Sequence, residues 1–321
     1  MPKIIDGTDI KSIDIAINEL NNGHVIALPT ETVYGLGADA TNDLAVQQIF
    51  SIKDRPAINP LICHVHKDFE LSAYVEVSPQ ARILMETFWP GPLSIICELK
   101  EDTPIASHVT AGLSSVALRA PHHPIFEEIL KRFARPIAAP SANKSQSLSP
   151  TSAEHVAESL SHADIYIIDG SIAPIGLEST IIDARTQKPI LLRHGAISVQ
   201  DIEACLSCSI DVSTQPNKEG KVLSPGQMLK HYSPQKSLKL NITQPNNDEA
   251  WLSFGSNEIN HPFELNLSET GNLDEAAKNL FSFLWKADKL NVKYISVAPI
   301  PNEGIGVAIN DRLNRAAREK S

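Results

Sequence analysis

The sequence is poor in aromatic residues and has no excess of positive charge. Phe, Trp and Tyr make up 5% of its 321 residues, and 28 Lys and Arg stand against 38 Asp and Glu, for a formal net charge of -10. Binding to nucleic acid depends mainly on neutralising phosphates, and unstacked bases usually lie on aromatic rings. The composition therefore argues against a broad nucleic-acid-binding surface, although it leaves room for a local basic pocket.

Long apolar runs are also missing, since no uninterrupted apolar stretch approaches the length that spans a membrane. The first residues, MPKIIDGTDIKSIDIAI, place acids among the apolar positions and lack the basic segment and apolar core of a signal peptide. With 42% hydrophobic and 21% charged residues, the composition is that of an ordinary soluble protein. We expect a cytoplasmic protein without membrane contact that is long enough for two domains.

Cysteine is scarce, with four residues in the chain. Cys63 and Cys97 lie in apolar runs of strand type, where a reduced thiol in the core is the expected state. Cys205 and Cys208 form a single CxxC motif. A structural zinc site normally needs a second pair of ligands, and none follows nearby. We therefore favour a plain helix end over a metal site at this motif.

The stretch ALPTETVYGLGADA, residues 27–40, reads as a strand that ends in polar groups. Its first residues are apolar, and Pro29 ends the strand because it lacks a backbone donor. Four hydrogen-bonding side chains follow, and Gly35 and Gly37 permit backbone turns or a close approach to a ligand. A helical pattern resumes at residues 44–52, so we expect a ligand-binding loop between a strand and a helix.

Two cations follow that helix. Lys53 and Arg55 lie two residues apart, and Pro56 biases Arg55 towards an extended conformation. Alternate residues of an extended segment face the same way, so both cations can point at one ligand. Phosphate is the natural partner of such a pair, and two solvated surface charges are the alternative interpretation.

Polar groups also follow later strand patterns. A strand predicted at residues 114–118 ends at Arg119, and one at residues 137–139 opens into PSANKSQSLSPTS, residues 140–152. That loop is either ordinary turn chemistry or an anion site made of several donors. The motif GLEST precedes a further strand, so several strands deliver polar groups at their ends.

A change of pattern predicts a second domain. Turn formers accumulate after the helix expected at residues 199–206, which indicates a linker. Beyond it, strand and helix patterns alternate, with strands at residues 250–254, 263–267 and 292–297 and helices at residues 273–290 and 304–318. This alternation predicts a smaller α/β domain.

Taken in order, the motifs resemble those of one family. The YrdC-like threonylcarbamoyl-AMP synthases have motifs similar to PTETVYGLGADA, KDRP followed by NPL and a histidine, WPGPL, an arginine before proline, PSAN with SPT, and GLEST. The segments SPGQMLKHYSP and PNEGIGVAINDRLNRAA look like the long form of that family. The resemblance implies an α/β fold in three parts: a twisted mixed-sheet YrdC-like domain with a ligand cleft (residues 1–208), a linker folding over the active site (residues 209–235), and a smaller Rossmann-like three-layer α/β domain (residues 236–321).

The resemblance also implies an activity. Members make L-threonylcarbamoyladenylate and pyrophosphate from L-threonine, bicarbonate or carbon dioxide, and ATP, which makes them nucleotidyltransferases. The labile product feeds a separate complex that forms threonylcarbamoyladenosine beside the anticodon of certain tRNAs. Small-molecule substrates are therefore the expected partners, with no stable nucleic-acid binding by the chain itself.

Residue roles follow from the same resemblance. Lys53 and Arg55 are expected to hold the ATP phosphates and to act as the catalytic residues. The rest of the ATP site is expected to comprise Asn59, Ser115, Ser141, Asn143, Ser149, Arg193 and Tyr232. The threonine site is expected to comprise Thr32, His64, Arg119 and Ser179. Mg²⁺ is expected to arrive on the ATP phosphates, with no metal ligand from protein side chains.

The chemistry needs no strong general base, because a carbamate formed on the threonine amine is already anionic when it attacks the α-phosphorus. Positioning and charge stabilisation are then sufficient, and a linker over the site would exclude water from labile intermediates. Two positions depart from the family pattern. Ala120 replaces a larger apolar residue before Pro121, which we expect to be only a packing change. Gln146 stands where glycine is expected after PSAN, so the backbone of that loop, and with it the role of Ser149, can differ.

The sequence disfavours two other interpretations. An RNA-binding module that recognises tRNA through a basic concavity is disfavoured by the net charge and the few aromatic residues. A carbamoyltransferase of hydrogenase maturation carries zinc-finger cysteine pairs and further domains, whereas this sequence shows a single CxxC motif.

Overall fold

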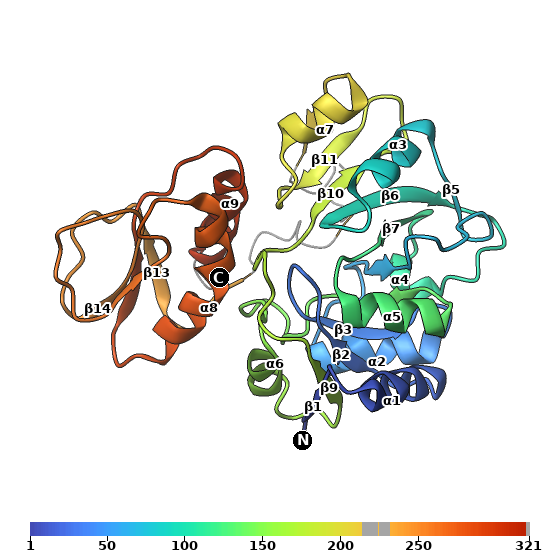
Figure 1. Ribbon diagram of the computed structural model, residues 1–321, viewed down its shortest axis with the longest axis horizontal. Helices are drawn as coiled ribbons and strands as arrows, with labels where there is room; N and C mark the ends of the chain where they lie inside the picture. The colour runs from blue at the N-terminus through green and yellow to red at the C-terminus, as the bar shows by residue number, and fades with distance from the viewer. Residues whose placement is uncertain (214–223, 225–231, 319–321) are drawn as a thin grey trace.

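Two separate β-sheets organise the protein, each with its own helices (Figure 1). The computed structural model describes residues 1–213, 224 and 232–318. Most of the predicted linker, residues 214–223 and 225–231, lies outside the described residues, and so does its predicted fold over the active site.

The larger sheet has twelve strands in the described residues and is mixed, as the sequence predicts. Its order is β1-β9-β2-β3-β8-β4-β7-β6-β10-β11-β12, with β5 paired to β6. Neighbours β4 and β7 are parallel, whereas β6 and β7 are antiparallel. The strands are β1 (Lys3–Asp6), β2 (Ile26–Leu28), β3 (Gly35–Asp39), β4 (Ile62–His64), β5 (Val75–Glu76), β6 (Leu93–Leu99), β7 (Ser115–Arg119), β8 (Ile137–Ala138), β9 (Tyr166–Asp169), β10 (Thr180–Asp183), β11 (Ile190–Arg193) and β12 (Asp211–Val212).

Helices cover this sheet by burying one apolar stripe each. In α1, Asp9 caps the first turn by accepting from the Lys11 amide, and Ile13, Ala16 and Leu20 are buried at helical spacing. These residues share a core cluster with the buried face of α5. The helices of this domain are α1 (Ile10–Asn21), α2 (Asp43–Lys53), α3 (Pro79–Phe88), α4 (Ser107–Thr110), α5 (Pro124–Phe133), α6 (Ala153–Ser159) and α7 (Val199–Leu206).

The smaller sheet has four parallel strands in the order β13-β16-β14-β15. Its elements are β13 (Ser237–Leu240), β14 (Glu249–Ser253), β15 (Glu264–Asn266), α8 (Leu273–Lys289), β16 (Tyr294–Val297) and α9 (Gly306–Ala316). Figure 1 shows α8 and α9 between this sheet and the large domain. No helix in the described ranges is both long and apolar enough to cross a membrane.

The core of the small domain continues into the large one. Its buried cluster joins residues of α8, α9 and the small sheet to Val33, Leu148 and Leu177, which come from three loops of the large domain. Polar contacts cross the same boundary, including the Trp285 indole donating to the Ser149 carbonyl at 3.2 Å. The two domains therefore share one hydrophobic core at their interface.

The structure corrects the prediction for Gly35 and Gly37. Both lie in strand β3, which pairs antiparallel with β2, so the polar loop connects two strands and not a strand and a helix. A Cβ on Gly35 would lie 3.2 Å from the Ala139 Cβ, and one on Gly37 would lie 3.0 Å from Ile137 Cγ2. These glycines permit close strand packing, which alternation of apolar residues could not reveal because glycine has no side chain.

The cysteines lie in two settings. Cys63 and Cys97 are buried in β4 and β6, as predicted. Cys205 lies in the last turn of α7, where its thiol donates to Thr87 Oγ1 at 3.2 Å, and Cys208 is exposed just beyond the helix. The CxxC motif thus occupies a helix end.

Gly176 tests the interface between the domains. Its φ is +76°, and an added Cβ would lie 2.6 Å from the Lys278 carbonyl oxygen on α8, whereas Gly112 has the same φ and nothing within 4 Å of its Cβ position. Gly112→Ala should lower the free energy of unfolding by about 1–2 kcal/mol through backbone strain alone. Gly176→Ala should cost about 1–3 kcal/mol more because the interface must also shift. Urea unfolding of both variants gives the difference, and equal losses would contradict the packed interface.

Candidate active site

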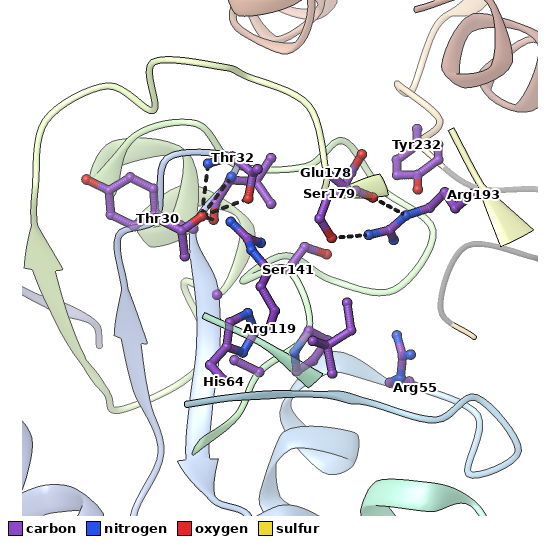
Figure 2. A pocket seen from close by; sticks show the side chains of 16 residues that line it. Thr30, Thr32, Arg55, His64, Arg119, Ser141, Glu178, Ser179, Arg193 and Tyr232 are labelled. Atoms are coloured by element: carbon purple, nitrogen blue, oxygen red, sulfur yellow. Dashed lines mark hydrogen bonds between the residues drawn. The ribbon is translucent and has the colours of Figure 1, made fainter. Parts of the chain in front are cut away.

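The pocket lies over one face of the large sheet, where parallel neighbours β4 and β7 run side by side (Figure 2). His64 ends β4 and Arg119 ends β7, and the two residues are register partners. Register partners point to the same face, so their side chains meet at one end of the pocket. The floor carries a small apolar cluster that includes Ile62 and Ala117. The empty space of the pocket, including the part that is open to solvent, is about 540 Å³.

The loop between β2 and β3 forms one wall and is organised by Thr30. The Thr30 hydroxyl accepts from the amides of Thr32 and Val33, both at 3.1 Å, and donates to the Val33 carbonyl at 2.7 Å (Figure 2). It also lies 2.8 Å from the Thr32 hydroxyl. Thr30 therefore fixes the position of Thr32, a predicted threonine-binding residue.

The His64 end of the pocket carries one fixed cation. Arg119 Nε donates to the Gly91 carbonyl at 3.3 Å, and its Nη2 lies 2.6 Å from Glu31 Oε2. Burial, together with the nearby Arg119 charge, lowers the pKa of His64 to about 3. His64 is therefore neutral at physiological pH and can serve as a hydrogen-bonding group without adding charge.

The other end carries two further guanidinium groups. Arg55 donates from Nε to the Asn59 carbonyl at 3.2 Å and from Nη2 to the Pro60 carbonyl at 2.8 Å. Arg193 donates from Nε to the Ser179 carbonyl at 3.0 Å and from Nη2 to the Ser179 hydroxyl at 3.1 Å (Figure 2). Burial, followed by the charge of Arg193, lowers the pKa of Arg55 to about 9. In the part of the chain that the structure describes, no ion pair joins Arg55 to a carboxylate, so this end favours an anion.

Lys53 corrects the prediction of two alternating cations. It is the last residue of α2, and Asp54 then adopts a left-handed conformation with φ 51°, so no extended segment aligns Lys53 with Arg55. The Lys53 ammonium donates to the Ser141 carbonyl at 2.6 Å and also to the Asn143 carbonyl. Burial lowers its pKa well below the usual value, and the Arg55 charge adds to this shift. Helix α2 extends to Lys53, past the end at residue 52 that the sequence predicts. The contacts of Lys53 hold the loop that follows β8.

The structure sorts the predicted site residues into two groups. Eight of them line the pocket: Thr32, Arg55, His64, Arg119, Ser141, Ser179, Arg193 and Tyr232. The others are buried but do not line it: Lys53, Asn59, Ser115, Asn143 and Ser149.

Three of these buried residues are connected to residues that line the pocket. Ser115 begins β7, the strand that ends at Arg119. The amide oxygen of Asn143 accepts from the Ser141 hydroxyl at 2.5 Å. Ser149 donates to Glu178 Oε1. These contacts connect the outer residues to the groups that face the pocket.

Gln146 keeps a conformation that glycine favours. Its φ is 69°, and its carbonyl accepts from the Ser233 amide at 2.9 Å. The side chain has therefore not forced the loop out of the left-handed region, although a non-glycine residue there costs about 1–2 kcal/mol.

Sequence reasoning missed Glu178 as a site residue. This buried carboxylate lines the pocket beside Ser179, and its Oε2 lies 2.8 Å from Arg312 Nε of helix α9. The motif GLEST signalled a polar strand end, but the partner lies 134 residues further along the chain. No local pattern joins residues at that separation.

The pocket offers cations and hydroxyls more than metal ligands. Among residues 1–213, 224 and 232–318, no group of three or more His, Cys, Asp or Glu side chains could hold a metal ion. Mg²⁺ prefers oxygen ligands and is usually bound through substrate phosphates. Among the described residues that line the pocket, Glu178 is the one carboxylate.

Fold and pocket together define a two-domain α/β protein with a buried, cation-lined site for a small anionic ligand. Residues 18–195 match the Sua5/YciO/YrdC family model, described as "Telomere recombination", and residues 197–318 match the model "Threonylcarbamoyl-AMP synthase, C-terminal domain". The chain belongs to the Sua5/YciO/YrdC family, in the form that carries this C-terminal domain.

Known relatives extend over the whole chain. A threonylcarbamoyl-AMP synthase of Pyrococcus abyssi is 35% identical over 95% of this chain and 94% of its own length, and one of Bacillus subtilis is 36% identical over 93% and 90%. The structure of this chain is similar to the crystal structure of P. abyssi Sua5 complexed with L-threonine, with a TM-score of 0.88 and 33% sequence identity. The match covers 99% of this chain and 97% of that chain.

The buried His64 predicts a pH dependence of stability. Its pKa in the folded protein is lowered to about 3, below the value of about 6.5 for an unfolded chain. The unfolded state therefore binds more protons between these values, so stability is complete above about pH 6.5 and is lost as the pH falls towards 3.

We expect His64→Gln to flatten this dependence. Between pH 7 and pH 5, the free energy of unfolding of the variant should fall less than that of the parent, by up to about 2 kcal/mol. His155, whose pKa burial lowers to about 4, is present in both proteins, so the difference isolates His64. Urea unfolding at the two pH values measures it, and identical losses would refute the assignment.

Proposed function

We propose that this chain is a threonylcarbamoyl-AMP synthase, which forms L-threonylcarbamoyladenylate and pyrophosphate from L-threonine, bicarbonate or carbon dioxide, and ATP. The observation that carries the proposal is the placement of two cationic groups at opposite ends of one pocket in a member of this family. His64 ends β4 and Arg119 ends β7, whereas Arg55 donates to the carbonyls of Asn59 and Pro60, which precede β4. Two separate cationic groups suit the carboxylate of threonine at one end and phosphates at the other.

Threonine binds at the Arg119 end in this proposal. A guanidinium recognises a carboxylate through charge-assisted hydrogen bonds, and Glu31 and Gly91 hold that of Arg119 in one orientation. Thr32 and Ser179 line the same pocket and supply hydroxyls, and neutral His64 supplies a ring nitrogen without repelling an ammonium group. The crystal structure of P. abyssi Sua5 is a complex with L-threonine, which supports this choice of ligand.

ATP binds towards Arg55 and Arg193, with Mg²⁺ carried on its phosphates as part of the substrate. Two buried guanidinium groups of like charge gain most when an anion lies between them, and triphosphate is such an anion. Lys53 holds the carbonyls of Ser141 and Asn143 and so shapes the loop beside the phosphates. Lys53 then acts mainly by positioning, while Arg55 faces the substrate.

The proposed reaction proceeds in two steps. The neutral threonine amine adds to carbon dioxide and releases a proton, giving a carbamate. A carbamate oxygen then attacks the α-phosphorus in line, and the bond to pyrophosphate breaks. Arg55 and Arg193 stabilise the charge that develops on the phosphates, so positioning and electrostatics supply the rate enhancement.

The product is a labile mixed anhydride, so a separate enzyme must consume it quickly. We propose that a tRNA-modifying complex takes it up to form threonylcarbamoyladenosine, and that this chain acts in the cytoplasm without binding tRNA stably. The net charge of -10 supports the last point.

Pyrophosphate release tests the proposal. With MgATP, release should require both L-threonine and bicarbonate, and Arg55→Gln should lower kcat/KM on the order of 10²- to 10³-fold because it removes a charge at the developing phosphate anion. Arg132→Gln is the matched control, since Arg132 lies at the surface and pairs with Asp14. Release that ignores either co-substrate would sink the assignment, and a gel shift with tRNA at physiological salt would then test the RNA-binding alternative.

Arg119→Lys tests the division of the pocket. Lysine keeps the charge but cannot copy the planar fork, so KM for L-threonine should rise on the order of tenfold while KM for ATP changes far less. Steady-state kinetics with each substrate varied in turn separates the two constants. An equal rise in both would place the residue at a shared or nucleotide subsite.

A further inference from the structure

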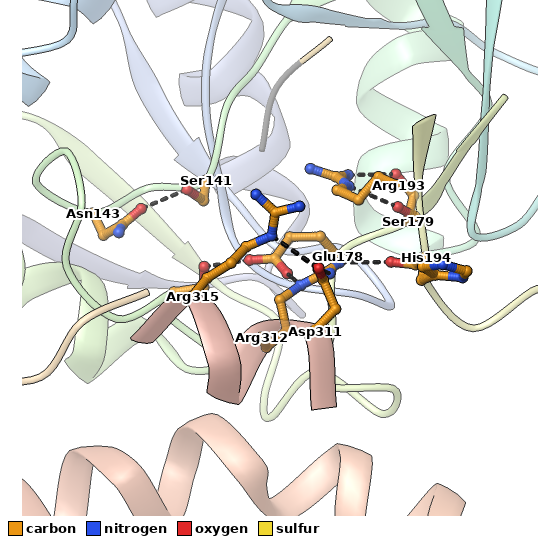
Figure 3. Close-up of polar contacts among 10 residues, drawn as sticks. Ser141, Asn143, Glu178, Ser179, Arg193, His194, Asp311, Arg312 and Arg315 are labelled. Atoms are coloured by element: carbon orange, nitrogen blue, oxygen red, sulfur yellow. Dashed lines mark hydrogen bonds and ion pairs between the residues drawn. The ribbon is translucent and has the colours of Figure 1, made fainter. Parts of the chain in front are cut away.

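Helix α9 of the small domain sends one guanidinium group into the wall of the pocket. Arg312 is 1% exposed, and each of its nitrogens has a partner (Figure 3). Nε lies 2.8 Å from Glu178 Oε2, Nη1 lies 2.7 Å from Asp311 Oδ2, and Nη2 donates to the His194 carbonyl at 2.8 Å. A buried arginine with this full set of partners holds a single orientation.

Two of these partners lie at one end of the pair β10 and β11. Glu178 precedes β10, and His194 follows β11, so the guanidinium bridges the start of one strand and the end of its antiparallel neighbour. Between them lie Ser179 and Arg193, which bind each other and line the pocket. Arg312 thus lies directly behind two predicted substrate-binding residues.

Glu178 connects this bridge to a second wall. Its Oε1 accepts from the Ser149 hydroxyl while Oε2 faces Arg312, so both oxygens are used. Burial opposes ionisation of Glu178, but the charges of Arg312 and Arg193 and the Ser149 hydrogen bond keep its pKa below the usual value. The carboxylate is therefore ionised and shared between a cation of each domain.

Tyr232 packs against the same guanidinium. The Arg312 Cζ lies 5.1 Å from the centre of the Tyr232 ring. The centres of the Tyr232 ring and the Phe281 ring of α8 are 5.7 Å apart. Tyr232 is buried and lines the pocket. One side chain of the small domain therefore contacts three parts of the pocket wall.

We propose that Arg312 is a positioning residue of the active site, which sets the placement of Ser179, Arg193 and Tyr232 through Glu178 and the His194 carbonyl. The proposal rests on the proposed function, because it names which part of the small domain that site needs. Without Arg312, Arg193 is the remaining cation whose charge acts on the buried Glu178, and this attraction draws Arg193 away from Ser179 and from the phosphates. Small displacements of a positioned group are costly to catalysis, on the order of 10²-fold for about 1 Å.

The test compares Arg312→Met, Arg312→Lys, Glu178→Gln and the double variant Glu178→Gln/Arg312→Met in the full chain. Arg312→Met should raise KM for L-threonine and lower kcat/KM on the order of 10²-fold. The double variant should recover part of that loss, because it no longer buries an unpaired carboxylate. Arg312→Lys should fall between, since one ammonium cannot hold Glu178 and the His194 carbonyl in a fork.

Lys289→Ala is the matched control. Lys289 also pairs across the domain boundary, with Glu158, but both side chains are about half exposed and neither lines the pocket. Its kinetic constants should stay within twofold of the parent. Loss of activity in Lys289→Ala equal to that in Arg312→Met would mean that any loosening of the boundary suffices, and would overturn the specific role of Arg312.

Hydrogen exchange of the ligand-free protein provides a readout without turnover. Amides of residues 177–180 and 193–195 should exchange faster in Arg312→Met and in Glu178→Gln, with unchanged circular dichroism. If Arg312→Met does not fold, Glu178→Gln alone decides the question. Unchanged exchange and unchanged KM in a folded variant would overturn the proposal, whereas a parent chain that releases no pyrophosphate would refute the proposed function and leave the exchange result standing.

Discussion

The pocket depends on burying cations without losing their hydrogen bonds. A guanidinium or ammonium group removed from water destabilises the fold by several kcal/mol unless other dipoles replace its hydration. Here main-chain carbonyls replace the lost hydration. Each carbonyl belongs either to another segment of the chain or to a turn close to the cation. The pairs are Lys53 with Ser141 and Asn143, Arg55 with Asn59 and Pro60, Arg119 with Gly91, and Arg193 with Ser179. The cations therefore connect the segments that form the pocket as well as supplying its charge.

Carbonyl dipoles satisfy hydrogen bonds but do not cancel a net charge. Glu31 balances Arg119, and Glu178 feels the charges of Arg312 and Arg193. Within the described ranges, the partners of Arg55 are main-chain carbonyls. The local field thus stays positive in a chain whose formal net charge is -10. The net charge of the chain governs long-range attraction of polyanions, whereas the positive charge inside the pocket governs binding of one small anion. That difference explains how an acidic protein can have a positively charged pocket.

Much of the site could be predicted because strand ends are visible in sequence. The apolar run before Pro29, the strand that ends at Arg119, and the polar loop after β8 all reach the same pocket. Features that depend on register or on distant partners could not be predicted. The strand β3 was hidden by its glycines, and the last turn of α2 extends to Lys53, past the point where the apolar pattern ends.

The Glu178–Arg312 pair illustrates the limit most clearly. Each residue reads in sequence as a surface charge, and only the tertiary fold brings them together in the interior. Strand β13 was likewise absent from the sequence prediction, since SLKL has a short pattern that becomes a strand through pairing with β16. Local pattern specifies elements and their polar ends, while their pairing comes from long-range packing.

The shared core at the domain boundary has a consequence for how the protein is divided. Val33, Leu148 and Leu177 belong by sequence to the large domain but are buried with residues of the small one. A large domain produced alone would expose these side chains to water close to the mouth of its own pocket. They would form an apolar patch that is prone to aggregation. Excising the small domain would therefore remove part of the hydrophobic core that buries these residues of the large domain.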